Sequence, residues 1–308
     1  MHLGRQVIPL AVMALFLSWF VCATRAQQPP DYDKAVFKTV EVTDNFYVLV
    51  ATTGGNIGVS VGTDGMLLVD DQYTPLYRKV RDALAHIGSQ PVRFVVSTHW
   101  HGDHLGGNEL MAKSGALLVA HENVRKRLIA QRSNPNADWR NPPLPDTYLP
   151  VITYPDRMAL HFNGDEVTIF HPGPAHTDGD SIVSFRQANV LHAGDVFVAA
   201  RYPVIIPAQG GSVDGTIAAL DRILKIANRD TKIIPGHGSV PATLKDVQDQ
   251  HDRILSVRDK VFSQIKAGKT LEQVLASKPT AGFEGNRTAG SSPDDFVKLV
   301  YQDLSAKH

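Results

Sequence analysis

The strongest constraint in this chain is a short segment at residues 98–104, which reads THWHGDH. Three imidazoles and one carboxylate fall close together in it, and such nitrogen and oxygen ligands suit a borderline-soft ion such as zinc. In an extended chain, residues two apart point to the same face, so the first two histidines can bind one ion together. We expect Gly102 to allow a sharp turn that directs Asp103 and His104 towards a second ion.

The position of this segment in the chain also favours a functional site. An apolar run at residues 92–96 precedes it and predicts a buried strand, so the segment lies in the loop at the end of that strand. Three later segments, at residues 173–180, 191–195 and 233–238, contain further histidines or aspartates beside short apolar runs. We expect each of them to lie at a strand end as well.

The pattern His-x-His-x-Asp-His resembles the signature of the metallo-β-lactamase superfamily. The three later segments are similar to those that carry the third histidine, the bridging carboxylate and the final histidine of that family, and the resemblance covers residues 36–245. It implies an α+β fold of four layers, an αββα sandwich. Apolar runs in both halves of the chain suit two sheets packed face to face with helices outside.

The resemblance further implies two divalent metal ions per chain, expected to be zinc, with manganese or iron as alternatives. The first ion is expected on His99, His101 and His176, and the second on Asp103, His104 and His237, with Asp195 bridging. A hydroxide between the ions is the expected nucleophile. Asp103 is the expected catalytic residue, because it can orient the hydroxide and carry a proton to the leaving atom.

One departure from the best-known β-lactamases concerns the second metal site, where those enzymes often use a cysteine thiolate. The only cysteine here is Cys22, far upstream of the motif, and Asp195 stands at the corresponding position. Hydrolases of thioesters, lactones and phosphodiesters in the family share this carboxylate. The sequence therefore predicts a hydrolase and leaves its natural substrate open.

Four further residues are candidates for positions around the metals. Asp70 closes an apolar strand and is placed to hydrogen-bond the ligand loop from behind. Thr177 follows the third histidine and could orient it. Family lactonases often place a tyrosine three residues after the bridging aspartate, where this chain has Phe197. Arg201 and Tyr202 could reach the pocket instead.

Composition and the N-terminal segment bound the partners and the location of the protein. Among the 308 residues, Lys plus Arg and Asp plus Glu are equal at 31 each, and this balance argues against nucleic acid as a partner. The resemblance to the hydrolase family implies a small-molecule substrate. Residues 1–26 have the anatomy of a secretory signal peptide, residues 27–35 read as a linker, and residues 36–308 as the hydrolase domain. We therefore expect a periplasmic or secreted protein without stable membrane association after cleavage.

Apolar periodicity and turn residues predict the secondary structure. Strands are expected at residues 36–42, 46–51, 57–61, 66–69, 92–96, 117–120, 158–162, 167–170, 181–185, 190–192 and 232–234. Helices are expected at residues 76–87, 122–131, 217–226 and 247–265, followed by two shorter ones. Residues 133–156, rich in proline, read as a long loop that is either a surface excursion or a lid over the metals.

Three functions compete. The leading one is an exported dinuclear zinc hydrolase that attacks a carbonyl substrate, namely a β-lactam, lactone, ester or thioester. A glyoxalase II-like thioesterase shares the bridging aspartate, but its glutathione thioester is a cytosolic substrate. An iron-dependent redox protein of the same fold is the third, and the complete set of seven ligands argues against the mono-iron type.

Overall fold

The computed structural model describes residues 30–132, 144–199, 202–282 and 292–306. The expected signal peptide, Arg201 and the first part of the 133–156 loop lie outside these residues. The compact unit runs from Asp31 to His308, so it begins within the expected linker, where a 3-10 helix, η1 (Tyr32–Lys34), is formed. None of the helices in the described part of the chain combines the length and apolar character that a bilayer crossing requires.

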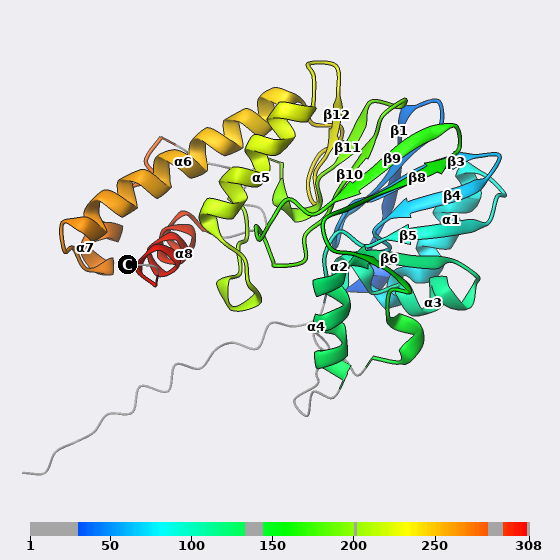
Figure 1. Ribbon diagram of the computed structural model, residues 1–308, viewed down its shortest axis with the longest axis horizontal. Helices are drawn as coiled ribbons and strands as arrows, with labels where there is room; N and C mark the ends of the chain where they lie inside the picture. Colours follow the sequence, from blue (N-terminus) through cyan, green and yellow to red (C-terminus); the bar gives the residue numbers. More distant parts are fainter. Residues whose placement is uncertain (1–29, 133–143, 200–201, 283–291, 307–308) are drawn as a thin grey trace, which may run out of the picture. The chain divides into compact units, whose positions relative to one another are not determined.

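The first sheet contains seven strands in sequential order (Figure 1). They are β1 (Phe37–Thr43), β2 (Phe46–Ala51), β3 (Ile57–Gly62), β4 (Gly65–Val69), β5 (Val92–Val96), β6 (Leu117–His121) and β7 (Ile152–Tyr154). The first four strands pair as antiparallel neighbours, whereas β4 to β7 are parallel. Parallel strands need crossover connections, and the helices after β4, β5 and β6 supply them.

The second sheet contains five strands in the order β12-β11-β10-β9-β8. They are β8 (Arg157–Phe162), β9 (Asp165–Phe170), β10 (Ile182–Phe185), β11 (Val190–His192) and β12 (Lys232–Ile234). The first four form an antiparallel meander, and β12 pairs in parallel with β11. The carboxyl ends of β11 and β12 therefore lie side by side.

The two sheets pack face to face around an apolar core. Valines of β2, β4, β5 and β6 meet valines and isoleucines of β9, β10 and β12 in a single buried cluster. Phe46 of β2 and Phe185 of β10 join the sheets directly, with ring centroids 4.7 Å apart in an edge-to-face arrangement. Such pairs contribute about 0.5–1.5 kcal/mol beyond the burial of their surface.

Helices cover the outer face of each sheet and complete the expected four layers (Figure 1). The α-helices are α1 (Tyr77–Ile87), α2 (Gly102–Leu105), α3 (Asn108–Lys113), α4 (Glu122–Arg132), α5 (Val213–Ile226), α6 (Leu244–Lys266), α7 (Leu271–Ala276) and α8 (Pro293–Ser305). Short 3-10 helices are η1, η2 (Thr74–Leu76), η3 (Asp146–Tyr148), η4 (Gly194–Val196) and η5 (Pro207–Gln209). Apolar residues of α1 and α3 pack on the first sheet, and those of α5, α6, α7 and α8 form a core beside the second.

The expected αββα sandwich is confirmed, and the main differences lie in short elements. The helices α2 and α3 and the strand β7 are absent from the expectations, because segments of three to six residues carry no readable period. Within the expected 133–156 loop, β7 completes the first sheet, and Tyr148 packs in a small core with Leu128 of α4. The described part of this loop is therefore a structural piece of the domain.

We expect Phe185→Ala to lower the free energy of unfolding by about 3–5 kcal/mol, the usual cost of removing a buried phenylalanine. Phe185 is 1% exposed and its ring contacts the opposite sheet. Urea unfolding followed by circular dichroism measures this change. Phe37→Ala, at a half-buried position of the edge strand β1, is the matched control and should cost clearly less. Equal losses in both variants would contradict the inter-sheet role of Phe185.

Candidate metal centre

The candidate ligands lie at the ends of strands from both sheets. His99 and His101 follow β5, His176 lies in the connection from β9 to β10, and the remaining loops follow β11 and β12. The turn after His101 differs from its expectation. Gly102 has no left-handed backbone but begins the helix α2, so helical geometry directs the two side chains that follow it.

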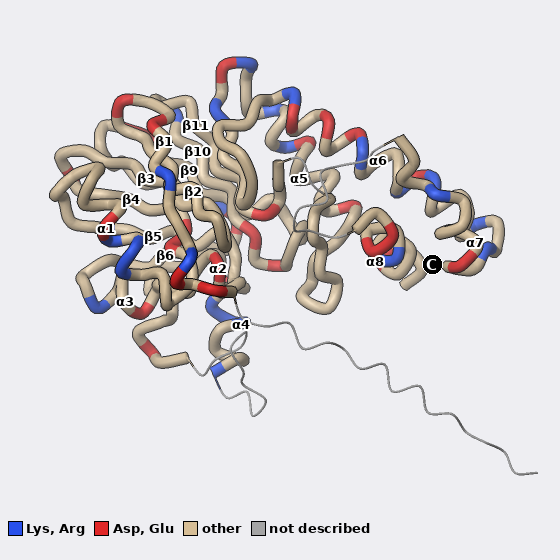
Figure 2. Tube along the Cα trace, turned by 180° about the vertical axis from the view of Figure 1, so that it is seen from behind, with Lys and Arg blue, Asp and Glu red and all other residues tan. Residues whose placement is uncertain are grey.

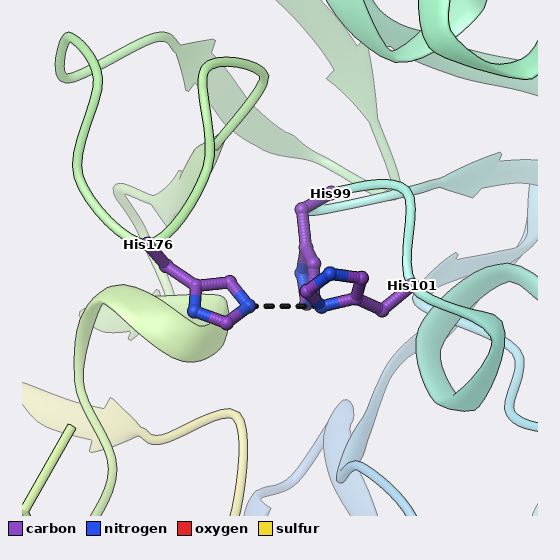
Figure 3. A group of neighbouring side chains, drawn as sticks. All are labelled: His99, His101 and His176. Carbon is purple, nitrogen blue, oxygen red and sulfur yellow. Dashed lines mark hydrogen bonds between the residues drawn. The ribbon is translucent and has the colours of Figure 1, made fainter. Parts of the chain in front are cut away.

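Three imidazoles form the first cluster (Figure 3). His99 Nε2 lies 3.0 Å from His101 Nδ1, and His176 Nε2 lies 2.9 Å from the same nitrogen. All three nitrogens are within 4.8 Å of one another. His99 and His176 are buried, at 1% and 2% exposure. The structure therefore brings together the three residues expected at the first ion, although they lie at strand ends of two different sheets.

The second ring nitrogen of each of these imidazoles faces an oxygen acceptor. His99 Nδ1 lies 3.1 Å from Thr98 Oγ1, and His101 Nε2 lies 2.6 Å from Gln209 Oε1. His176 Nδ1 lies 2.5 Å from the carbonyl oxygen of Val204. Since an acceptor requires an N–H, this network assigns the tautomers. The three nitrogens that face one another then all present lone pairs, an arrangement that a cation would satisfy.

The second cluster combines two histidines with two carboxylates. His104 Nε2 lies 3.2 Å from His237 Nε2, 3.3 Å from Asp195 Oδ1 and 3.6 Å from Asp103 Oδ2. His237 Nε2 lies 3.3 Å from Asp103 Oδ2. The potential ligand atoms of Asp103, His104 and His237 lie within 4.8 Å of one another. This is the group expected at the second ion.

Asp195 lies between the two clusters. Its Oδ2 atom is 3.7 Å from His176 Nε2 of the first cluster and 3.4 Å from His237 Nε2 of the second. The loop after β12 passes close to the Asp195 side chain. A Cβ atom at Gly236 would come within 1.9 Å of Asp195 Oδ1. Glycine is therefore required directly before His237 for a steric reason.

Burial keeps the first cluster neutral. It lowers the pKa of His99 well below its usual range, and the neighbouring imidazoles lower it further. Burial likewise lowers the pKa of His101, and that of His176 to about 4. Metal binding requires deprotonated imidazole, so these histidines are ready to bind a cation at neutral pH.

Carboxylates reverse this effect in the second cluster. Burial opposes protonation of His104, but Asp195, Asp103 and Asp70 outweigh it and raise its pKa well above the usual range. The pKa of His237 is raised to about 9, because Asp195 and Asp103 likewise outweigh burial. Conversely, His104 and His237 hold the pKa values of both carboxyl groups below their usual range despite burial. Protons thus balance the carboxylate charge in this cluster, and a metal ion would replace them.

The residues expected around the ligands lie in different surroundings. Asp70 accepts hydrogen bonds from the backbone N–H of Thr98 at 2.7 Å and from its hydroxyl at 2.8 Å, and its Oδ2 atom lies 2.7 Å from His104 Nδ1. It therefore lies behind the ligand loop as expected. Its left-handed backbone, with φ of 68°, directs it there. Asp is one of the few side chains that adopt this conformation readily.

Thr177 and Tyr202 make contacts other than the expected ones. The hydroxyl of Thr177 donates to Asp180 Oδ1 at 2.6 Å, whereas the ring of His176 is oriented by the Val204 carbonyl. Tyr202 is 4% exposed and stacks on Phe296 of α8, with ring centroids 5.0 Å apart, so it packs in the core beside the second sheet. Arg201 lies outside the described residues.

Two residues next to the ligands are missing from the expectations. Gln209 contacts His101 directly. The side-chain amide of Asn56 donates to the carbonyl oxygens of Pro235 and Gly238, at 2.9 and 3.2 Å, and so holds the loop of His237 from both sides. Neither residue belongs to a motif, and both act across long stretches of sequence.

We expect the affinity for a second ion to rise with pH while the affinity for the first stays nearly level. Below its pKa of about 9, His237 carries a proton that a metal must displace, whereas His176, with a pKa of about 4, is already neutral. Each displaced proton corresponds to a change of about tenfold per pH unit. Calorimetric zinc titrations between about pH 6 and about pH 8 test this. Equal slopes for both binding steps would contradict the assignment.

We expect Asp70→Asn to lower the affinity for the second ion by about 10–100-fold while leaving the fold intact. This is the usual effect of losing a hydrogen-bond partner of a ligating histidine. Asparagine tolerates the left-handed backbone of this position but offers His104 no negative charge. Zinc competition with a chromophoric chelator measures the affinity, and thermal unfolding checks the fold. Asp44→Asn, at an exposed turn, is the control and should behave as wild type. Unchanged zinc binding in Asp70→Asn would exclude a supporting role.

Comparison with known proteins is consistent with this geometry. The α subunit of 2,4-dinitroanisole O-demethylase from Nocardioides sp. (strain JS1661) is 30% identical over 47% of this chain, and the match covers 42% of that protein. Metallo-beta-lactamase type 2 from Bacillus sp. (strain 170) is 25% identical over 57% of this chain and 63% of its own length. This chain therefore matches less than two thirds of either relative.

The solved structure of the sec-alkylsulfatase Pisa1 from Pseudomonas sp. superposes with a TM-score of 0.64 at 16% identity, over 87% of this chain and 50% of that one. A likeness at this identity shows the fold alone. The sequence profile of the Metallo-beta-lactamase superfamily matches residues 48–237, which include every candidate ligand of both clusters. With its two sheets and its His/Asp clusters, the chain belongs to the metallo-β-lactamase superfamily.

Proposed function

We propose that this protein is a hydrolase that uses two divalent metal ions, of which zinc fits the ligands best, to attack a small carbonyl substrate. The observation that carries the proposal is the convergence of two ligand clusters on one carboxylate, Asp195. His99, His101 and His176 would hold the first ion, and Asp103, His104 and His237 the second. Imidazole and carboxylate ligands suit zinc, and also accommodate manganese or iron.

The metal ions, Asp195 and Asp103 would have different roles in the reaction. When bound, divalent cations supply Lewis acidity and a water that ionises near neutral pH. Asp195 holds the two clusters at a fixed separation. Asp103 is 20% exposed, the most open of the carboxylates in the site. Its position suits the role of a group that orients the attacking water and carries a proton to the leaving atom.

The candidate ligands favour a carbonyl substrate but do not identify which one. Asp195 stands where a thiolate would stand in many β-lactamases, so lactones, esters and thioesters are candidates alongside β-lactams. The relative that shares 30% identity is named as an O-demethylase of 2,4-dinitroanisole, an aryl ether. Hydrolysis of an activated aryl methyl ether to a phenol and methanol is therefore the second candidate reaction. Iron-dependent redox chemistry remains the alternative outside hydrolysis.

The proposed partner is a small molecule, with neither nucleic acid nor a membrane as a stable partner. Basic and acidic residues are mixed along α6 and interspersed over the described elements (Figure 2), which supports this view. Export to the periplasm or the medium, after cleavage of residues 1–26, is part of the proposal and rests on the leader sequence alone.

We expect the purified protein to bind close to two zinc ions per chain and to hydrolyse at least one carbonyl substrate. Metal analysis gives the stoichiometry. A panel of β-lactams, lactones, aryl esters, thioesters, phosphodiesters and 2,4-dinitroanisole gives the reaction. Activity should disappear with a chelator and return with zinc. One iron per chain, with no hydrolysis after zinc is added, would contradict the proposal.

Asp103→Asn provides the variant for this experiment. It should slow hydrolysis by about 10²–10⁴, the usual contribution of a positioned proton-transfer group. Asp44→Asn is again the control, because this carboxylate lies in an exposed turn between β1 and β2. Wild-type turnover by Asp103→Asn at full metal occupancy would remove Asp103 from the mechanism.

A further inference from the structure

The segment before α5 supplies hydrogen-bond acceptors to two of the three histidines in the first cluster. Val204 contributes its backbone carbonyl to His176, and Gln209 contributes its side-chain oxygen to His101 at 2.6 Å. The third, His99, faces the neighbouring Thr98 hydroxyl. Gln209 is therefore the acceptor that reaches the first cluster through a side chain from a distant part of the sequence.

The backbone of Gln209 is itself firmly held. It ends the 3-10 helix η5, and its carbonyl oxygen accepts a hydrogen bond from the N–H of Asp178 at 3.1 Å. The carboxylate of Asp178 forms an ion pair with Arg127 of α4, with Nη2 and Oδ2 2.7 Å apart. The following Gly210 is left-handed, and a Cβ atom there would lie 2.6 Å from Asp178 Cβ. The backbone from which the Gln209 side chain extends is therefore held in place.

We propose that Gln209 is a positioning residue for the first metal ion: its oxygen accepts the Nε2–H of His101 and so keeps Nδ1 as the lone pair that faces His99 and His176. The inference rests on the proposed metal site. An imidazole has two tautomers, and the one with the proton on Nδ1 would direct an N–H at the other two histidines and could not bind the ion. A single acceptor at Nε2 removes that alternative.

The chemical nature of the acceptor matters as well. His104, in the second cluster, is supported by the anionic carboxylate of Asp70, whereas His101 is supported by a neutral amide. A charged acceptor raises the basicity of a ligating imidazole more than a neutral one does. Gln209 therefore fixes the geometry of His101 while leaving the first ion more electron-poor than a carboxylate would.

Two substitutions separate these effects. Gln209→Met keeps the length of the side chain but offers only a weak sulfur acceptor. It should lower the affinity for the first zinc ion by about 10–100-fold and leave the affinity for the second unchanged. Gln209→Glu restores an oxygen acceptor and adds a charge, so it should bind the first ion at least as tightly as wild type. Gln302→Met, on the exposed side of α8, is the matched control and should have no effect.

Nitrogen NMR of the histidine side chains gives a readout that does not need metal. In the metal-free wild type, His101 should be in the Nε2–H form, and in Gln209→Met it should become a mixture of both tautomers. If wild type binds no metal, the proposed function fails while this measurement still tests Gln209. Wild-type affinity for the first ion in Gln209→Met, together with an unchanged His101 tautomer, would overturn the inference. Rescue by Gln209→Glu would exclude a purely structural role.

Discussion

The carboxylate of Asp195 is the point on which the arrangement of the site depends. It is 11% exposed and lies 3.3–3.7 Å from His104, His176 and His237, which come from three separate segments, and a Cβ atom at position 236 would clash with its Oδ1 atom. A buried negative charge is costly unless positive or hydrogen-bonding groups surround it. The imidazoles of His104 and His237 supply that environment, and the sheets on which they lie must pack together to bring them there.

Local sequence patterns predicted most of the strands and longer helices, and they also indicated the candidate ligands. The histidines and aspartates stand beside apolar runs whose alternation identifies strands, so their location at strand ends followed directly from the sequence. The two residues missed around the site make contacts that no local pattern encodes. Gln209 acts on a residue 108 positions away, and Asn56 bonds to a carbonyl 179 positions away. Tyr202 illustrates the reverse error, since closeness in sequence to a ligand placed it near a pocket while α8 buried it in the core.

The location of the clusters links metal binding to the packing of the two sheets. His99, His101 and His104 follow strand β5 of the first sheet, while Asp195 and His237 follow strands of the second. An ion held by residues from both sheets binds the folded form alone. It therefore stabilises that form according to its concentration relative to Kd, by about 2.7 kcal/mol at a hundredfold excess over Kd. Asn56 adds a metal-independent link of the same kind, because it lies in the first sheet's loops and bonds the loop after β12.

Val204 and Gln209 support the same cluster in different ways. In the segment before α5, the residue type can therefore vary at one of these positions and not at the other. Val204 acts through its carbonyl oxygen, and its side chain is 38% exposed. Evolution or an engineer could replace that side chain with many others and keep the support of His176 intact. Gln209 has no such freedom, because its contact is made by the side chain itself. Position 204 is therefore a natural place to diversify a library beside the metals without disturbing the ligands.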